Sequence, residues 1–432
     1  MTTVAERGNQ TPRLRRAFIS KTGEWLFALF LLAGYFKADP RLAFIQKHID
    51  ITLLFLGLSF LVFLYHGFKS SFAQKIPLSF SWLALLFLLL GACLIGGLLY
   101  TESKQYGFDK ALRFVFLTGW AFFGTVLLIT DFWSLRRFSW ALIVISTTMA
   151  IDAFLNYPGR GQINFVTAFG SNYIALARAG GLGLLTTVIF LLPTERRPLV
   201  KLCLWIVTAL QLWAALSAGA RGPVLALILS FLLFFALSVR GFLRLRIDRF
   251  ALRLGVVTLF AAIIFTAVGQ ELFSTLAFRS QILVTEGGTS VAMRLGLYQA
   301  ALDQWARSPI WGGGTGQFGI AVTGADIREY PHNIVLELGA ETGLLGVLVF
   351  TIMIGMAFKE GFVCLRTENR LLRSVSQYLL VTCCFALLNA LVSGDINDNR
   401  MLFTFMGLLG AARGLSNNEV KKYEHRANKG QK

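Results

Sequence analysis

Twelve apolar stretches, most of them close to 20 residues long, restrict most strongly what this chain can fold into. The hydrocarbon core of a bilayer is roughly 30 Å thick, and a helix needs about 20 apolar residues to cross it. Hydrocarbon offers the backbone no hydrogen-bond partners, so only helices and closed barrels can span it. We therefore predict an all-α integral membrane protein with about 12 transmembrane helices.

The expected spans are bounded by charged residues, Pro or Gly, and they lie at residues 22–38, 49–67, 80–100, 112–130, 135–155, 173–192, 199–217, 222–239, 251–268, 334–357, 374–393 and 400–415. The first span is the weakest, because Glu24 and Lys37 limit its apolar part to about twelve residues. A charged fraction of 15% and a mean hydropathy of +0.63 agree with a chain that lies mostly in lipid.

The distribution of basic residues predicts how the spans are oriented. If the N-terminus is cytoplasmic, the segments on that side hold 27 of the 41 Lys and Arg residues, and the opposite side holds 14. Because short cytoplasmic loops are enriched in Lys and Arg, we expect both termini in the cytoplasm. The chain then consists of a basic tail (1–21), one membrane domain (22–415) and a second basic tail (416–432), with the first span as a retained anchor.

The net charge of +18 does not indicate nucleic-acid binding, because the basic residues are spread over many short loops and form no single groove. Anionic lipid headgroups are the expected partners of most of them. The five cysteines lie in or beside the expected spans, which predicts buried thiols and neither disulfides nor metal thiolates.

One connection is much longer than the others. About 65 residues, 269–333, separate the ninth and tenth spans on the side away from the cytoplasm, and long ordered loops are usually functional. Within this loop, residues 290–306 form a periodic segment that predicts an amphipathic helix, able to lie along the membrane surface. Its expected apolar face consists of Val291, Leu295, Tyr298, Leu302 and Trp305.

A run rich in Pro and Gly follows in the same loop, at residues 308–316 (SPIWGGGTG). It is either a structural turn or a contact for an anion through its backbone N–H groups. Nucleotide binding is not expected, because the run lacks the Lys-Ser/Thr pair that closes a P-loop and faces the compartment without ATP.

His332 is the one of four histidines that lies in the long outer loop where a span begins. An imidazole with a pKa of about 6.5 accepts a hydroxyl proton at neutral pH, so His332 is the natural general base. A purely hydrogen-bonding role is the alternative. No metal is expected, because the loop offers neither a second histidine nor a closely spaced pair of carboxylates.

Arg221 lies in a connection of a few residues between the seventh and eighth spans, close to membrane depth. Arginine there is costly unless it is paired or solvated, so it is either functional or reaches to the interface. Arg294, Arg160 and Arg178 can join it on the same face. Several arginines that converge at the outer leaflet suit a phosphate or pyrophosphate group, which guanidinium binds in a bidentate manner.

These residues occur in a pattern that resembles the O-antigen ligase and polymerase superfamily. The resemblance is strongest over residues 215–350 and includes the span layout of the whole chain. It is carried by Arg221-Gly222, Arg294, residues 308–318 (SPIWGGGTGQF), 331–338 (PHNIVLEL) and 341–346 (ETGLLG).

The resemblance implies a periplasmic glycosyltransferase of the bacterial inner membrane that uses no metal or other cofactor. Its donor would be a glycan on undecaprenyl pyrophosphate, and in the ligase branch the acceptor is lipid A–core oligosaccharide. His332 would be the base, and Arg221 and Arg294 would bind pyrophosphate. Further substrate contacts are expected from Arg160, Arg178, Tyr330, Asn333 and Asp395, the last as the acid that this family often has near its last outer loop.

Among the alternatives we favour the ligase, whose partners would be the lipid-linked donor, lipid A–core and membrane lipids, but no nucleic acid or nucleotide. An O-antigen or exopolysaccharide polymerase remains open, because the same arginines and histidine could serve it. A protein O-oligosaccharyltransferase fits less well with the short tail after the last span. A lipid-linked glycan transporter would need ionisable residues in mid-span, and Asp152 is the nearest case in the sequence.

Overall fold

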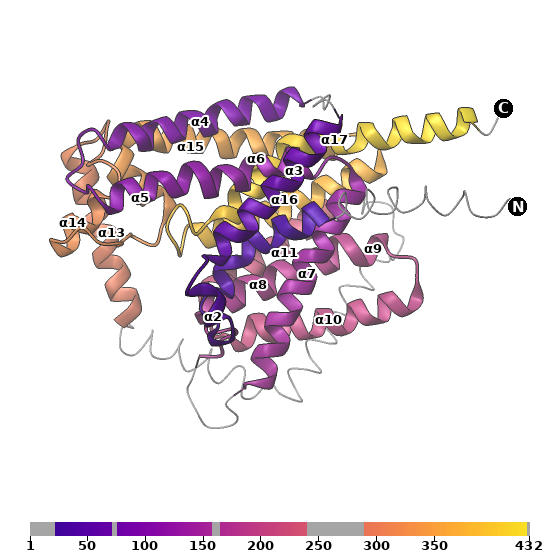
Figure 1. Cartoon of the computed structure of the whole chain (residues 1–432), viewed down its shortest axis with the longest axis horizontal. Coiled ribbons are helices and arrows are strands. Elements are labelled where there is room, and N and C mark those ends of the chain that lie inside the picture. The colour runs from indigo at the N-terminus through magenta and orange to yellow at the C-terminus, as the bar shows by residue number, and fades with distance from the viewer. Residues whose placement is uncertain (1–21, 71–75, 158–164, 240–288, 430–432) are drawn as a thin grey trace, which may run out of the picture.

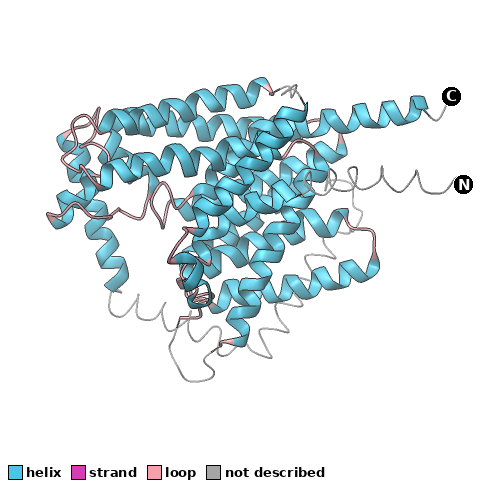
Figure 2. Ribbon diagram, viewed as in Figure 1, coloured by secondary structure: helices cyan, strands magenta, loops and turns pink. Residues whose placement is uncertain are grey.

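The computed structural model describes residues 22–70, 76–157, 165–239 and 289–429. Within these ranges every regular element is helical and no strand occurs (Figure 2). The predicted fold class, an all-α multi-pass membrane protein, is confirmed.

Eight helical units of the described residues are long and apolar enough to cross a membrane. Two of them run through a short π-helical stretch, α5–η4–α6 at Tyr106–Leu128 and α8–η5–α9 at Tyr173–Thr194. The other six are α4 (Leu78–Gly97), α7 (Phe132–Leu155), α10 (Pro198–Ser217), α11 (Arg221–Val239), α15 (Ile334–Leu365) and α16 (Arg370–Ala390).

The remaining expected spans are less regular. The helices Pro40–Gln46 and Ile51–Tyr65 meet at 65° and give a ninth candidate if they form one span, whereas the helix Thr22–Tyr35 is shorter than the rest. Helix α17 (Arg400–Lys429) begins at the twelfth expected span and continues into the polar C-terminal region. The ninth expected span, 251–268, lies outside the described residues, so the total of about 12 stays a prediction.

Aromatic side chains fill much of the core between α4, α6 and α17. The ring of Phe87 stacks on those of Phe114 and Phe122, with centroids 4.9 and 4.8 Å apart, and meets Phe403 edge to face. Offset-stacked and edge-to-face pairs of this kind add to the energy of burial. Helix α17 therefore sits in the interior of the bundle at its N-terminal half, where it also packs against α15 and α16.

The long loop places its helices at one end of the bundle. Helices α13 (Thr289–Arg307) and α14 (Gln317–Thr323) pack against α15 beside the beginning of α5, and the C-terminal part of α17 projects from the opposite end (Figure 1). The chain segments directly before α11, α15 and α17 can therefore contribute residues to a site beside these loop helices.

Helix α13 includes the predicted helix at residues 290–306. The residues buried against α15 and α14 are Leu297, Ala301 and Gln304, whereas Leu295 and Leu302 are 60% and 45% exposed. The helix therefore packs against the bundle through one side and leaves part of the predicted apolar face exposed, so a position along the membrane surface stays a prediction.

The Gly-rich run 308–316 is fixed to a break in α15. Gly343 has φ +64° and ψ −158°, which no helix tolerates, so carbonyls before it and N–H groups after it lose their helical partners. The N–H groups of Gly313 and Gly314 donate to the carbonyls of Ala340 and Glu341 at 2.7 and 3.0 Å, and the carbonyl of Pro309 accepts from Leu344. These amides are therefore used within the fold, which supports the structural turn over the anion contact.

We expect Gly343→Ala to lower stability by at least about 2 kcal/mol, because a positive φ is strained for alanine and its Cβ would clash with the carbonyl oxygen of Ile310. Thermal unfolding of the purified protein in detergent measures the effect. Gly355→Ala is the matched control, since it lies in the same helix with nothing within 4 Å of the added Cβ. Equal unfolding temperatures for the two variants would contradict this account of the break.

Candidate functional site

Two of the predicted arginines line the same pocket. Arg221 begins α11 and Arg294 lies on α13, and both border a polar pocket together with Tyr173 and Ser393. The pocket contains about 370 Å³ of empty space, part of it open to solvent. Two guanidinium groups beside one opening suit an anionic ligand with several oxygen atoms.

Arg178 lies next to this pocket but is used mainly by the fold. Its Nη2 donates to the carbonyl oxygens of Asn389 and Ser393, both at 2.8 Å, near the C-terminal end of α16. A cation is favourable there because the last carbonyls of a helix have no partners within it. Since Ser393 also lines the pocket, Arg178 fixes part of the pocket wall.

His332 directly precedes the N-cap of α15 and has a strained backbone. Its φ is +55°, a value that residues other than glycine rarely adopt and that recurs at functional sites. The side-chain oxygen of Asn333 then accepts from the N–H groups of Val335 and Leu336 at 2.9 and 3.1 Å, which caps the helix. The cap and the left-handed turn together fix where the imidazole leaves the chain.

The surroundings of His332 favour the neutral imidazole. Burial lowers its pKa below the usual 6.5, and the positive charges of Arg294 and Arg178 lower this pKa further. The carboxylates of Glu329 and Asp395 act in the opposite direction but do not cancel the effect. At neutral pH the imidazole can therefore accept a proton, as a general base must.

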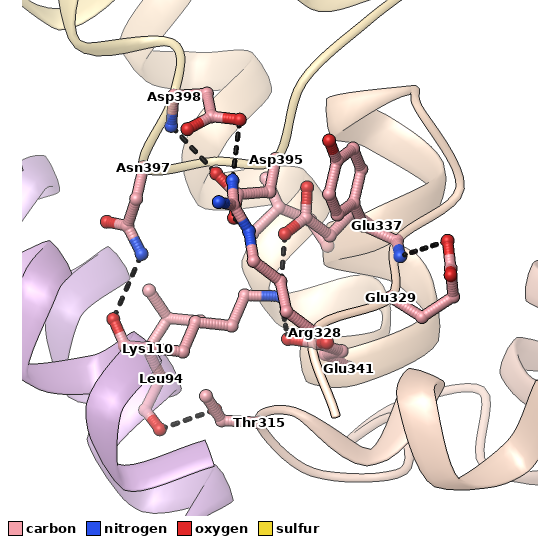
Figure 3. Close-up of polar contacts among 12 residues, drawn as sticks. Leu94, Lys110, Thr315, Arg328, Glu329, Glu337, Glu341, Asp395, Asn397 and Asp398 are labelled. Carbon is pink, nitrogen blue, oxygen red and sulfur yellow. Dashed lines mark hydrogen bonds and ion pairs between the residues drawn. The ribbon is translucent and has the colours of Figure 1, made fainter. Parts of the chain in front are cut away.

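Asp395 and Tyr330 belong to a second group of contacts around Arg328. Asp395 lies in the segment between α16 and α17, and its nearly buried carboxylate is 2.9 Å from Nη2 of Arg328 (Figure 3). The guanidinium carbon of Arg328 is 5.4 Å from the centroid of the Tyr330 ring. Burial and the charge of Asp398 raise the pKa of Tyr330 to about 12, so its hydroxyl keeps its proton.

Sequence reasoning missed a buried group of charges beside these residues. Nζ of Lys110, on α5, lies 2.6 Å from Oε1 of Glu337 and 2.7 Å from Oε2 of Glu341, and all three side chains are at most 2% exposed. The carbonyl of Lys110 also accepts from Nδ2 of Asn397 at 3.0 Å. Figure 3 shows how these contacts join α5, α15 and the segment that carries Asp395.

Asp152, the nearest case of a mid-span ionisable residue in the sequence, does not belong to this group. Asp152 accepts from Nη2 of Arg41 at 2.8 Å and from the N–H of Phe169 at 2.8 Å, which makes it a structural link near the end of α7. A usable signal for the missed group was the pair Glu337 and Glu341, one helical turn apart in an apolar stretch, because buried carboxylates need a cation.

The structure brings Arg221 and Arg294 to one pocket and places His332 within the electrostatic reach of Arg294. His332 itself does not line that pocket. The ring of Tyr330 contacts the imidazole of His332 directly, with ring centroids 4.6 Å apart. Arg160 lies outside the described residues.

Comparison with known families supplies the decisive observation. The family model described as O-Antigen ligase matches residues 206–351, a stretch that includes Arg221, Arg294 and His332. This match supports membership of the O-antigen ligase and polymerase superfamily. Curated proteins give no match to the chain.

Members of the O-antigen ligase and polymerase superfamily are membrane-embedded glycosyl-transferring enzymes, and the family implies lipid-linked glycans as substrates. The matched stretch runs from the second half of α10 into α15 and so includes the Gly-rich run and the break at Gly343. Arg178 and Asp395 lie outside it and enter the site through the fold alone.

Proposed function

We propose that this protein is an O-antigen ligase, which transfers O-antigen polysaccharide from undecaprenyl pyrophosphate to lipid A–core oligosaccharide at the periplasmic face of the inner membrane. The observation that carries the proposal is the pocket shared by Arg221 and Arg294, together with the effect of Arg294 on the nearby His332. A cationic pocket for the leaving group and a neutral base are the two parts that such a transfer requires.

In the proposed reaction an acceptor hydroxyl attacks the anomeric carbon of the donor glycan while His332 takes the hydroxyl proton. The new glycosidic bond forms as the bond between the anomeric carbon and the pyrophosphate oxygen breaks, and undecaprenyl pyrophosphate leaves with the electron pair. One displacement of this kind inverts the anomeric centre. No metal or other cofactor takes part in the proposed mechanism.

Arg221 and Arg294 would meet the negative charge that develops on the pyrophosphate, and each well-placed donor of this kind commonly contributes about 3 kcal/mol. Arg160, Arg178, Tyr330, Asn333 and Asp395 are proposed as further substrate contacts. For Asn333 the side-chain oxygen already caps α15, so its NH₂ group is the part that can face a sugar.

A polymerase of the same superfamily is the second candidate, because the same residues can activate a growing glycan as acceptor. A deletion strain separates the two. Long polymer that accumulates on the carrier lipid and never reaches lipid A–core supports the ligase, whereas single repeats on lipid A–core support the polymerase. Lipid movement without a glycan product, measured with purified protein in vesicles, would instead support a transporter.

We expect His332→Ala to abolish transfer, with at least about a 100-fold loss of rate, because general base catalysis contributes about 10²–10⁴-fold. The rate is measured with purified protein, lipid-linked glycan and lipid A–core. His48→Ala is the matched control, since His48 is exposed and lies outside the site. Full activity of His332→Ala would remove the base from the proposal.

We expect Arg221→Ala and Arg294→Ala to lower kcat/KM for the donor by about 100-fold each, because each removes a charged donor to the pyrophosphate. The lysine variants at the same two positions keep the charge but lose bidentate geometry, and they should fall between alanine and the native protein. An unchanged kcat/KM in either alanine variant would exclude that arginine from donor binding.

The pKa of His332 predicts the acid limb of the pH profile. A base must be neutral, so the rate should be constant near pH 7 and fall as pH drops through a pKa below 6.5. Arg294→Gln removes a positive charge that lowers this pKa, so the midpoint of its limb should move to higher pH. A midpoint above pH 7 in the acid limb of the native protein would contradict the expectation that His332 is neutral at pH 7.

A further inference from the structure

Three alternate residues before α15 form a row of contacts that ends at the proposed base. The guanidinium carbon of Arg328 lies 5.4 Å from the centroid of the Tyr330 ring. The Tyr330 ring in turn lies 4.6 Å from that of His332, at an interplanar angle of 66°. The Tyr330 ring therefore contacts both the guanidinium and the imidazole.

The outer end of this row is firmly held. Nη2 of Arg328 lies 2.9 Å from Oδ2 of Asp395 and 2.6 Å from Oδ2 of Asp398, and Nε donates to Oδ2 of Asp395 at 3.1 Å. Asp395 is only 2% exposed in its side chain, and its Oδ1 accepts from the N–H of Asp398 at 2.7 Å. A planar guanidinium held by two carboxylates has little freedom to turn.

The imidazole has no comparable hydrogen bond of its own. Its Nδ1 is buried, and within the described residues it has no hydrogen-bond partner. In most sites a hydrogen bond to one ring nitrogen sets the orientation of a histidine. Here the backbone turn at His332 and the contact with the Tyr330 ring must do so.

We propose that Arg328 is a positioning residue for the base: through the Tyr330 ring it fixes the orientation of the His332 imidazole, and it neutralises the carboxylates on that side of the site. This inference rests on the proposed role of His332 as general base. It assigns Asp395 the task of holding Arg328, in addition to any contact with substrate.

The charges around His332 make the second part of the proposal measurable. Arg294 on α13 and Arg178 on α8 oppose protonation of the imidazole, whereas Asp395 and Glu329 favour it. Arg328 offsets one of the two negative charges of Asp395 and Asp398. Its loss removes this positive charge from Asp395 and Asp398 and so favours the imidazolium form of His332, although Arg400 still interacts with both carboxylates.

The test compares Arg328→Gln and Arg328→Lys with the native protein in two assays. The pH dependence of His332 modification by diethyl pyrocarbonate, read by mass spectrometry, reports the pKa of the imidazole without using activity. We expect the midpoint to rise by on the order of 1 pH unit in Arg328→Gln, because a positive charge is lost, and to stay unchanged in Arg328→Lys.

The transfer assay tests orientation. Arg328→Lys keeps the charge but lacks the planar group that contacts the Tyr330 ring, so we expect kcat to fall about tenfold with little change in KM for the donor. Arg307→Gln is the matched control, because it removes one exposed positive charge from the same loop and should leave both assays unchanged.

An unchanged midpoint in Arg328→Gln overturns the electrostatic part, and native kcat in Arg328→Lys overturns the orienting part. If Arg328→Gln does not fold, Asp395→Asn replaces it, and its midpoint should move down because a negative charge is lost. Absence of transfer by the native protein would refute the proposed function instead, while the modification midpoints would still decide whether Arg328 acts on His332.

Discussion

The break in α15 at Gly343 is the constraint on which the geometry of the site depends. A helix that continued unbroken would use the carbonyls of Ala340 and Glu341 for itself, and the Gly-rich run would have no place to bind. Because the run takes these carbonyls, the loop between α13 and α14 is fixed to the wall of the bundle. The segment that follows α14 then leads to His332, and the cap at Asn333 fixes the chain directly after His332.

Positive and negative side chains lie on different sides of the segment that carries His332. Arg221 and Arg294 border the pocket, whereas the acidic side chains lie toward α5 and α17 and are held by Lys110 and Arg328. A carboxylate that is already paired competes less for a pocket arginine. His332 therefore lies between arginines on one side and carboxylates on the other.

The sequence predicted the parts of this architecture that depend on local composition. Every expected span within the described ranges coincides with a helix, because a run of apolar residues determines a membrane helix without reference to the rest of the chain. His332 and Arg294 could be proposed as site residues from their place in the long loop and its motif. The row from Asp395 through Arg328 was not, since no local pattern links residues 67 positions apart. Which side of α13 packs against α15 could not be predicted, because Leu297 and Leu295 are equally apolar and only the position of α15 decides between them.

The buried ammonium of Lys110 also constrains the order in which the protein can be assembled. Glu341 is synthesised 231 residues after Lys110, a delay of roughly 10–50 s at ordinary translation rates. A buried lysine without a partner is costly, so the ammonium can take up its buried position only after Glu337 and Glu341 have been made. The contact therefore joins two segments that are synthesised far apart in time.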